Sequence, residues 1–293
     1  MAKQTVLCTP DNSTDAAFRG WGSAISTALQ ALFVKVTQAG EIDWGTVTKP
    51  TTATDSMGFE VYRFNDSLQG TAPIYFKFEY GSGPGSASRF GVWITVGKGA
   101  DGSGTITGTL LARVQAILSS STLTASAKNC YIGNGDGSCL VMSLWPSDAG
   151  MTNSMLVLER SRDDNGNPTA AAVMWQYSGA ANSIGYQFYG CIDYTAMTAV
   201  SLPFGCINIQ YPLTANVSLS NGENTPVFVA SCLTTQRVAW VPTSLMGVAQ
   251  ADFGAGVVAT ALNNGIDYLA LGSACPYADI AKQQYASAMI RWD

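Results

Sequence analysis

Acidic side chains are the main groups in this chain that could carry out chemistry. The candidates stand in strand-like or turn-like surroundings: Glu41, Asp43, Glu60, Asp66, Glu79, Asp136, Glu159, Asp163 and Asp252. A glycoside hydrolase needs two carboxyl groups that converge across a cleft. Acids beside turn residues, such as Asp43 and Asp66, are more often turn caps. We therefore predict no catalytic residue and keep a carboxylate-based glycan hydrolase as an alternative.

The chain contains no histidine. Its absence excludes Ser–His–Asp and Cys–His catalysis, the usual zinc enzymes and pH switching by imidazole. Residues 97–102 match the dinucleotide motif GxGxxG, but SGTITG follows where the motif needs a helix. We interpret this run as a turn and predict no cofactor.

Two further patterns resemble metal or redox sites and fail on their spacing. Asp163, Asn165 and Asn167 resemble the start of a calcium loop, but Pro168 and Met174 replace its required Gly and Glu. A hairpin turn is favoured, and no metal ligand is predicted. The seven cysteines include no CxxC pair: Cys8, Cys130, Cys139, Cys191, Cys206, Cys232 and Cys275. Reduced thiols are the favoured state. The alternative is a disulfide between Cys130 and Cys139 across a hairpin.

Composition restricts the partners. Charged residues form 12% of the 293 residues and the net charge is −5, so the surface is neutral and polar. Such a surface favours contact with other protein subunits and argues against nucleic acid or an anionic membrane. The first 15 residues have no apolar signal region, and no apolar run is long enough to span a bilayer.

Residues 59–107 predict three antiparallel strands joined by Gly-rich turns. In the middle strand Ile74, Phe76 and Phe78 alternate with polar positions, which indicates one buried and one solvated sheet face. We expect Phe59 and Val61 on one flanking strand, and Val92, Ile94 and Val96 on the other, to supply matching buried faces.

Residues 11–34 predict an amphipathic helix, capped by Asn12, Ser13 or Thr14. Its apolar stripe has helical spacing: Phe18, Trp21, Ile25, Ala28, Leu29 and Leu32. We expect the helix to pack on the sheet of its own domain; the alternative is a helix presented to a neighbouring subunit.

The remaining segments predict further β-structure. Residues 109–121 fit either a helix or a strand, whereas residues 128–145 and 154–177 each predict a hairpin. The C-terminus is expected to be a docked strand. The predicted fold is mainly β, or β-rich α+β: antiparallel sheets or a sandwich with an N-terminal amphipathic helix on the sheet. The predicted domains are 1–122 (helix plus sheet) and 123–293 (β-rich).

Aromatic residues in the second half could contact sugars or another protein. The candidates are Trp175, Tyr177, Tyr186 and Tyr189. Amphipathic strand positions are the commoner explanation for such residues. A receptor-binding, lectin-like module is therefore an alternative reading.

Several blocks resemble a family of tailed-bacteriophage virion structural proteins. They are FRGWGSAISTAL, GEIDWGTVTKP, GFEVYRFNDSLQGTAPIYFKFEYG, VWITVGKGADGSGTITG, LVLERSRDDNGNPTAAAVMW, and DYLALG with ASAMIRWD. The resemblance implies a non-enzymatic tail, baseplate or fibre protein, with a head-decoration or collar protein as the alternative. It also implies assembly in the host bacterial cytoplasm and location in the virion. The expected partners are copies of itself, as a trimer or hexamer, other virion proteins and a host surface glycan or receptor.

Overall fold

A computed structural model describes most of the N-terminal half of the chain and the strands of the rest. The described residues are 3–118, 127–144, 154–162, 167–180, 183–190, 194–199, 215–218, 224–229, 232–233, 238–240, 245–248, 257–261, 266–270 and 287–292, some of them by backbone alone. Within them the fold is mainly β, with antiparallel sheets and one N-terminal helix, as the sequence predicts.

The three predicted strands form the centre of a five-stranded sheet. Its strands follow the order β2 (Val34–Lys35), β3 (Ser56–Arg63), β4 (Tyr75–Ser82), β5 (Phe90–Gly97) and β8 (Leu111–Leu118). Strand β8 settles the ambiguity of residues 109–121 in favour of a strand. A small hairpin of β6 (Gly99–Ala100) and β7 (Ile106–Thr107) follows β5. The prediction that the GxGxxG run is a turn is therefore confirmed.

The second sheet has seven strands. It contains both the first strand of the chain, β1, and the strands that follow the five-stranded sheet in the sequence. Its order is β1 (Lys3–Cys8), β9 (Lys128–Gly133), β10 (Cys139–Leu144), β11 (Ser154–Arg162), β12 (Pro168–Ala180), β13 (Ser183–Gly190) and β14 (Thr198–Ala199). The short 3-10 helix η1 (Gly135–Gly137) links β9 to β10. Both predicted hairpins, β9–β10 and β11–β12, are confirmed.

The third sheet lies near the C-terminus. Its order is β15 (Ala215–Ser218), β16 (Asn224–Val229), β19 (Leu245–Val248), β22 (Ser287–Arg291), β21 (Ile266–Ala270) and β20 (Val258–Ala261). Strands β17 (Cys232–Leu233) and β18 (Val238–Trp240) form a separate pair. The predicted C-terminal strand is confirmed as β22. Trp292, directly after it, packs its ring edge-on to Tyr131 of β9, with ring centroids 5.6 Å apart.

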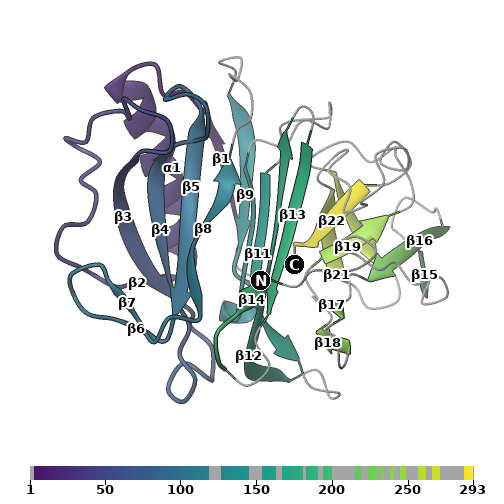
Figure 1. The fold of residues 1–293 in the computed structure, drawn as a ribbon. Coiled ribbons are helices and arrows are strands. Elements are labelled where there is room, and N and C mark those ends of the chain that lie inside the picture. Colours follow the sequence, from purple (N-terminus) through teal and green to yellow (C-terminus); the bar gives the residue numbers. More distant parts are fainter. Residues whose placement is uncertain are drawn as a thin grey trace.

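The three large sheets follow one another from left to right in Figure 1. One hydrophobic core joins the first two sheets and includes the apolar stripe of helix α1 (Asp15–Leu32). The helix lies against β1 and β9, while Trp21 contacts Tyr80 of β4, so the helix fills the space between the sheets. Every residue of the predicted stripe is buried.

The start of α1 is held by two of its predicted capping residues. Thr14 caps the helix, because its hydroxyl accepts from the Ala17 amide. Asn12 has a different role. Its amide donates to the carbonyls of Gly81, Ala87 and Arg89, and its oxygen accepts from the indole of Trp21. This buried asparagine therefore fastens the helix to the β4–β5 connection.

The predicted division at residue 122 stays a prediction. It falls between β8 and β9, at residues outside the described set. Strand β1 crosses it, because residues 3–8 pair with β9 in the second sheet. The N-terminal strand thus ties the two predicted domains together.

The structure corrects the face assignment of β3. The register pairs Glu60 with Phe78, so Glu60 and Tyr62 lie on the core side, and Phe59 and Val61 on the opposite side. The prediction that Phe59 and Val61 share the buried face of β4 is therefore wrong. The run FEVYRF places apolar or aromatic residues in both phases of a strand, so alternation alone does not choose the face.

Two helical glycines provide a matched test of this packing. A Cβ at Gly20 would meet no atom within 4 Å, whereas one at Gly22 would lie 2.1 Å from the Trp44 ring. We expect Gly20→Ala to stabilise the protein by roughly 0.5–1 kcal/mol through helix propensity. Gly22→Ala is expected to destabilise it by about 1–3 kcal/mol through overpacking. Urea unfolding measures both; equal effects would contradict the packing of Trp44 on Gly22.

Candidate functional site

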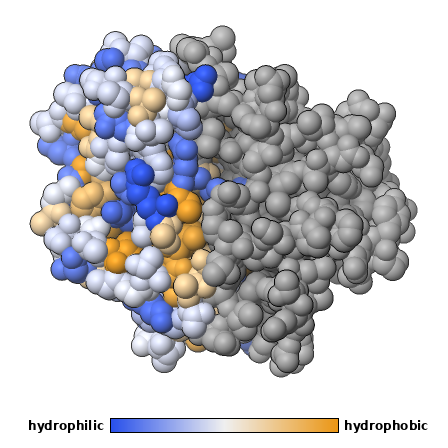
Figure 2. All heavy atoms as spheres, viewed as in Figure 1, coloured by the Kyte–Doolittle hydropathy of each residue, from blue (hydrophilic) through white to orange (hydrophobic). Residues whose placement is uncertain are grey.

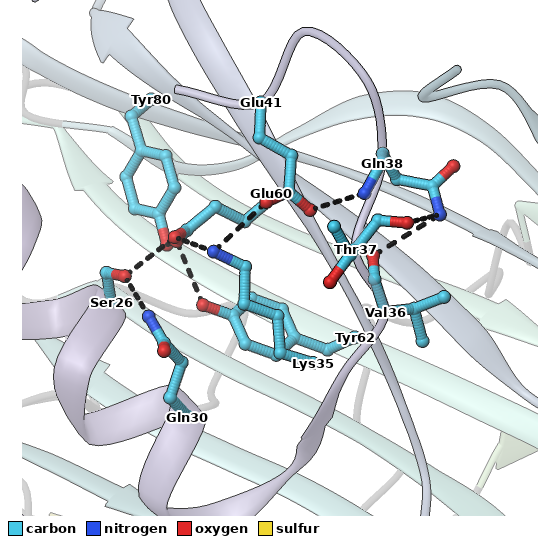
Figure 3. Close-up of polar contacts among 10 residues, drawn as sticks. All are labelled: Ser26, Gln30, Lys35, Val36, Thr37, Gln38, Glu41, Glu60, Tyr62 and Tyr80. Carbon is cyan, nitrogen blue, oxygen red and sulfur yellow. Dashed lines mark hydrogen bonds and ion pairs between the residues drawn. The ribbon is translucent and has the colours of Figure 1, made fainter. Parts of the chain in front are cut away.

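The most concentrated polar cluster surrounds Glu60 of β3, whose side chain is 1% exposed (Figure 3). One carboxylate oxygen accepts from the Ser26 hydroxyl at 2.8 Å and from the Lys35 ammonium at 3.0 Å. The other accepts from the hydroxyls of Tyr62 at 2.9 Å and Tyr80 at 3.0 Å. Tyr62 belongs to β3 itself, and the other three donors come from α1, β2 and β4, so the cluster joins these three elements to β3.

Lys35 links this buried carboxylate to the surface. Its ammonium also lies 3.1 Å from a carboxylate oxygen of Glu41, which in turn accepts from the Gln38 amide through its other oxygen. Burial lowers the pKa of Lys35, but the hydrogen bonds and negative charges of Glu60 and Glu41 outweigh it, so the pKa is raised. Lys35 therefore stays protonated and balances the buried charge at neutral pH.

The Glu41–Glu60 pair is the nearest approach to the hydrolase alternative among the described acids. Both carboxylates contact one ammonium, so they converge, as a glycoside hydrolase requires. However, Lys35 lies between them, and both oxygens of Glu60 already accept two hydrogen bonds in an inaccessible position. The carboxylate is 1% exposed and all of its contacts are with the protein's own donors, so it presents no open face to a substrate. This geometry fits a structural role, in which Glu60 holds α1, β2 and β4 to β3.

The tyrosines of this cluster are expected to resist ionisation. Burial, followed by the charge of Glu60, raises the pKa of Tyr62 well above its usual value; burial, Tyr62 and Glu60 do the same for Tyr80. A raised folded-state pKa means that the unfolded state loses its protons first, so stability falls as the pH rises above about 10.

Ultraviolet titration of tyrosinate measures this effect. We expect at least two of the 12 tyrosines to ionise only as the protein unfolds. The double variant Tyr62→Phe and Tyr80→Phe should lose two residues from that late class. Complete ionisation of a protein that is still folded would contradict the prediction.

A second buried charge pair connects the first two sheets. Arg160 of β11 contacts Asp66 through two nitrogens, Nε to Oδ2 and Nη2 to Oδ1, and donates to the Ala72 carbonyl at 2.8 Å. The side chains are 0% and 4% exposed. Asp66 also accepts from the Leu68 amide, so the predicted turn role of this acid is confirmed. Its long-range partner was not predicted.

The outer face of the five-stranded sheet carries a third cluster. The Glu79 carboxylate lies 2.8 Å from Arg113 Nε and 3.9 Å from Lys77 Nζ. Arg113 lies 4.4 Å from the centre of the Trp93 ring, and Lys77 lies 5.2 Å from that of Phe59. The Lys77–Glu79 pair lies within β4 and the other contacts link different strands; together these cation–π and ion-pair contacts stabilise the sheet face. In the view of Figure 2, hydrophilic and apolar residues are interspersed over the coloured, described part of the molecule.

Two of the remaining predicted acids, Asp43 and Glu159, have side chains within the described part of the chain. Asp43 is a turn cap, as predicted, because it accepts from the Gly45 amide and the Thr46 hydroxyl, and these bonds lower its pKa. Glu159 is buried in β11, 3% exposed. The side chain of Asp136, and Asp163 and Asp252 entirely, lie outside the described residues.

The aromatic candidates are described by their backbone alone. The β12–β13 register pairs Tyr177 with Tyr186 and Trp175 with Phe188, whereas Tyr189 pairs with Met174. Tyr177 and Tyr186 are therefore directly opposite each other on neighbouring strands. Tyr189 occupies the alternate register phase from Trp175, Tyr177 and Tyr186. Their side chains lie outside what the structure describes. A glycan or protein contact at these residues stays a prediction.

The alternative, a Cys130–Cys139 disulfide, is not formed, and the favoured interpretation of reduced thiols holds for this pair. Cys130 and Ile132 belong to the core between the first two sheets. Cys139 pairs with Glu159, out of phase with core-facing Leu140, so it lies on the opposite face of the sheet. Both residues carry buried thiols. Cys130 instead has its sulfur 3.7 Å from that of Cys8.

Membrane-spanning helices and metal-ligand clusters are both absent from the described ranges. In that part of the chain no helix has the length and apolarity to cross a bilayer. No cluster of three or more potential metal-ligating Cys, Asp or Glu side chains occurs among those residues.

Comparison with known proteins adds no relative. No protein family, no curated protein and no solved structure matches this chain.

Proposed function

We propose that this protein is a non-enzymatic structural component of a tailed-phage virion, associated with the tail, baseplate or fibre. It acts through contacts with its own copies and with other virion proteins after assembly in the host cytoplasm. Support comes from the resemblance of its sequence blocks to that protein family. A capsid decoration or collar protein is the alternative position, and it would use the same kind of interface.

Exposed apolar residues at sheet edges are the observation that carries this proposal. β1 ends the seven-stranded sheet and β20 ends the six-stranded one. Leu7 of β1 is 68% exposed, and Val258 of β20, with the adjacent Val257, is 44–45% exposed. Edge strands offer hydrogen-bonding groups to another chain, and exposed apolar side chains favour such contacts.

The internal charges support the same reading. Glu60 and the Asp66–Arg160 pair use their hydrogen-bonding groups to join elements of the fold. Because these charged groups are used to hold elements of the fold together, they support a rigid structural role. One observation favours a second candidate, a receptor-binding module: Tyr177 lies opposite Tyr186 in the β12–β13 register. Paired tyrosines in a sheet can form a sugar-stacking surface.

The solution mass of the purified protein, measured by light scattering over a range of concentrations, tests the proposal. We expect a stable closed oligomer, a trimer or hexamer, with no turnover of glycans. Leu7→Asp and Val258→Asp should weaken the oligomer, whereas Thr51→Asp adds the same charge at an exposed loop residue and should not. A monomer at every concentration, or glycan turnover abolished by one Asp or Glu substitution, would overturn the proposal.

A further inference from the structure

Two thiols from distant parts of the sequence meet inside the second sheet. Cys8 ends β1 and Cys130 lies in β9, and their sulfurs are 3.7 Å apart. The register pairs Val6 with Cys130 and Cys8 with Lys128, so the two cysteines are diagonal neighbours on the same, core-facing side. Forming a disulfide requires the sulfurs to approach to about 2 Å. A side-chain rotation and a small shift of the edge strand β1 would provide that approach.

The position of this pair in the chain makes a bond between them consequential. Helix α1 and the whole five-stranded sheet, β2 to β8, lie between the two cysteines along the sequence. A bond between them would enclose residues 9–129 in one covalent loop. It would also fix β1, the strand that ties the N-terminal half to the second sheet, to its neighbour β9.

We propose that Cys8 and Cys130 are an oxidisable pair that closes to an intrachain disulfide when the protein meets a disulfide oxidant such as oxidised glutathione. The pair does not depend on the proposed function. It identifies a covalent modification site at two thiols that the structure shows in their reduced form.

The reaction balances as a thiol–disulfide exchange. The Cys8 thiolate attacks one sulfur of oxidised glutathione, forms a mixed disulfide and releases one glutathione thiolate. The Cys130 thiolate then attacks the Cys8 sulfur, forms the Cys8–Cys130 bond and releases the second glutathione. The two protein thiols lose two protons and two electrons, and one oxidised glutathione is reduced to two glutathione molecules. Cys8 reacts first because it ends an edge strand and is 9% exposed, whereas Cys130 is 0% exposed.

Peptide mapping under non-reducing conditions tests the pairing directly. Cleavage by trypsin after Lys and Arg, and by endoproteinase Asp-N before Asp, separates every cysteine in question. Cys8 falls in peptide 4–10, Cys130 in 129–135 and Cys139 in 136–147. After the full-length protein is incubated with oxidised glutathione, we expect peptides 4–10 and 129–135 to be joined, and to separate on reduction. Cys139, on the other face of the sheet, is the internal control.

Cysteine variants provide a second test of the proposed disulfide. The disulfide closes a long loop, which constrains the unfolded chain, so the oxidised protein should have a higher unfolding temperature than the reduced one. Cys8→Ser and Cys130→Ser should each abolish both the joined peptide and this shift, whereas Cys139→Ser should retain both. Peptides 4–10 and 129–135 that stay separate in the oxidised wild-type protein, or a bond from Cys130 to Cys139, would overturn the proposal.

Discussion

Replacement of Asp66 by Asn is expected to reduce the free energy of unfolding by about 3–5 kcal/mol. Asn keeps the shape of the side chain and an oxygen for the Leu68 amide, but it removes the charge opposite Arg160. The guanidinium, whose side chain is 0% exposed, is then left as a buried and uncompensated cation. Chemical denaturation monitored by tryptophan fluorescence measures the loss.

A double-mutant cycle with Arg160→Met separates this pair from other effects. The single Arg160 variant should be about as damaging as Asp66→Asn, because it leaves the aspartate charge buried. The double variant should lose much less than the sum of the two. Asp43→Asn is the control, since Asp43 is a fully exposed turn acid, and it should change stability far less. Additive losses would show that Asp66 and Arg160 do not interact.

The Asp66–Arg160 pair also leads to an expectation about how the protein unfolds. Asp66 lies in the connection between β3 and β4, and Arg160 lies in β11, so the pair joins the first sheet to the second. The shared hydrophobic core crosses the same boundary. These contacts favour a single cooperative transition for the described parts of the two sheets.

Replacement of Glu60 by Gln is expected to lower the free energy of unfolding by about 3 kcal/mol. Both carboxylate oxygens accept from two donors, so an amide NH2 in place of either oxygen would face two groups that now donate. Buried polar groups that lose their partner cost about 1–3 kcal/mol, and more when a charge is involved. Urea unfolding measures the change.

Glu41→Gln is the matched control, because it removes the other carboxylate that contacts Lys35. Its side chain is more exposed, 14% against 1% for Glu60, so the expected loss is under about 1 kcal/mol. A second readout distinguishes a charge effect from simple misfolding. The charge of Glu60 helps to raise the pKa of Tyr62 and Tyr80, so these tyrosines should ionise at lower pH in Glu60→Gln. Equal losses in the two variants would contradict the role given to Glu60.

Local patterns in the sequence were enough to predict the N-terminal helix, the three central strands and two hairpins. The helix stripe from Phe18 to Leu32 follows from 3.6-residue spacing, and every predicted stripe residue is buried. The GxGxxG run was rejected as a nucleotide site because a turn follows it. Asp101 accounts for that turn, since it accepts from the Ser103 and Thr105 amides, and these bonds lower its pKa to about 2.

Predictions from the sequence failed where a strand carries apolar residues on both of its faces, or where the outcome depends on which distant segments pack together. Residues 59–64 carry apolar or aromatic side chains in both phases, and the sequence interpretation chose Phe59 and Val61 for the core. The structure places Glu60 and Tyr62 there. For the cysteines, the favoured interpretation of reduced thiols agrees with the structure at Cys130 and Cys139. The alternative hairpin disulfide fails because the strand phases place the two residues on opposite faces and bring Cys8 to Cys130 instead.

By itself, the sequence determined the mainly β fold, the N-terminal helix, the positions of two hairpins and the exclusion of histidine chemistry. These depend on residue type and on spacing over a few positions, which act within one element. Only the tertiary structure decided that β1 joins the second sheet, that Glu60 faces the core and that Asp66 meets Arg160. Such choices depend on which distant donors and charges can satisfy a buried group, and that is settled only when the sheets pack together.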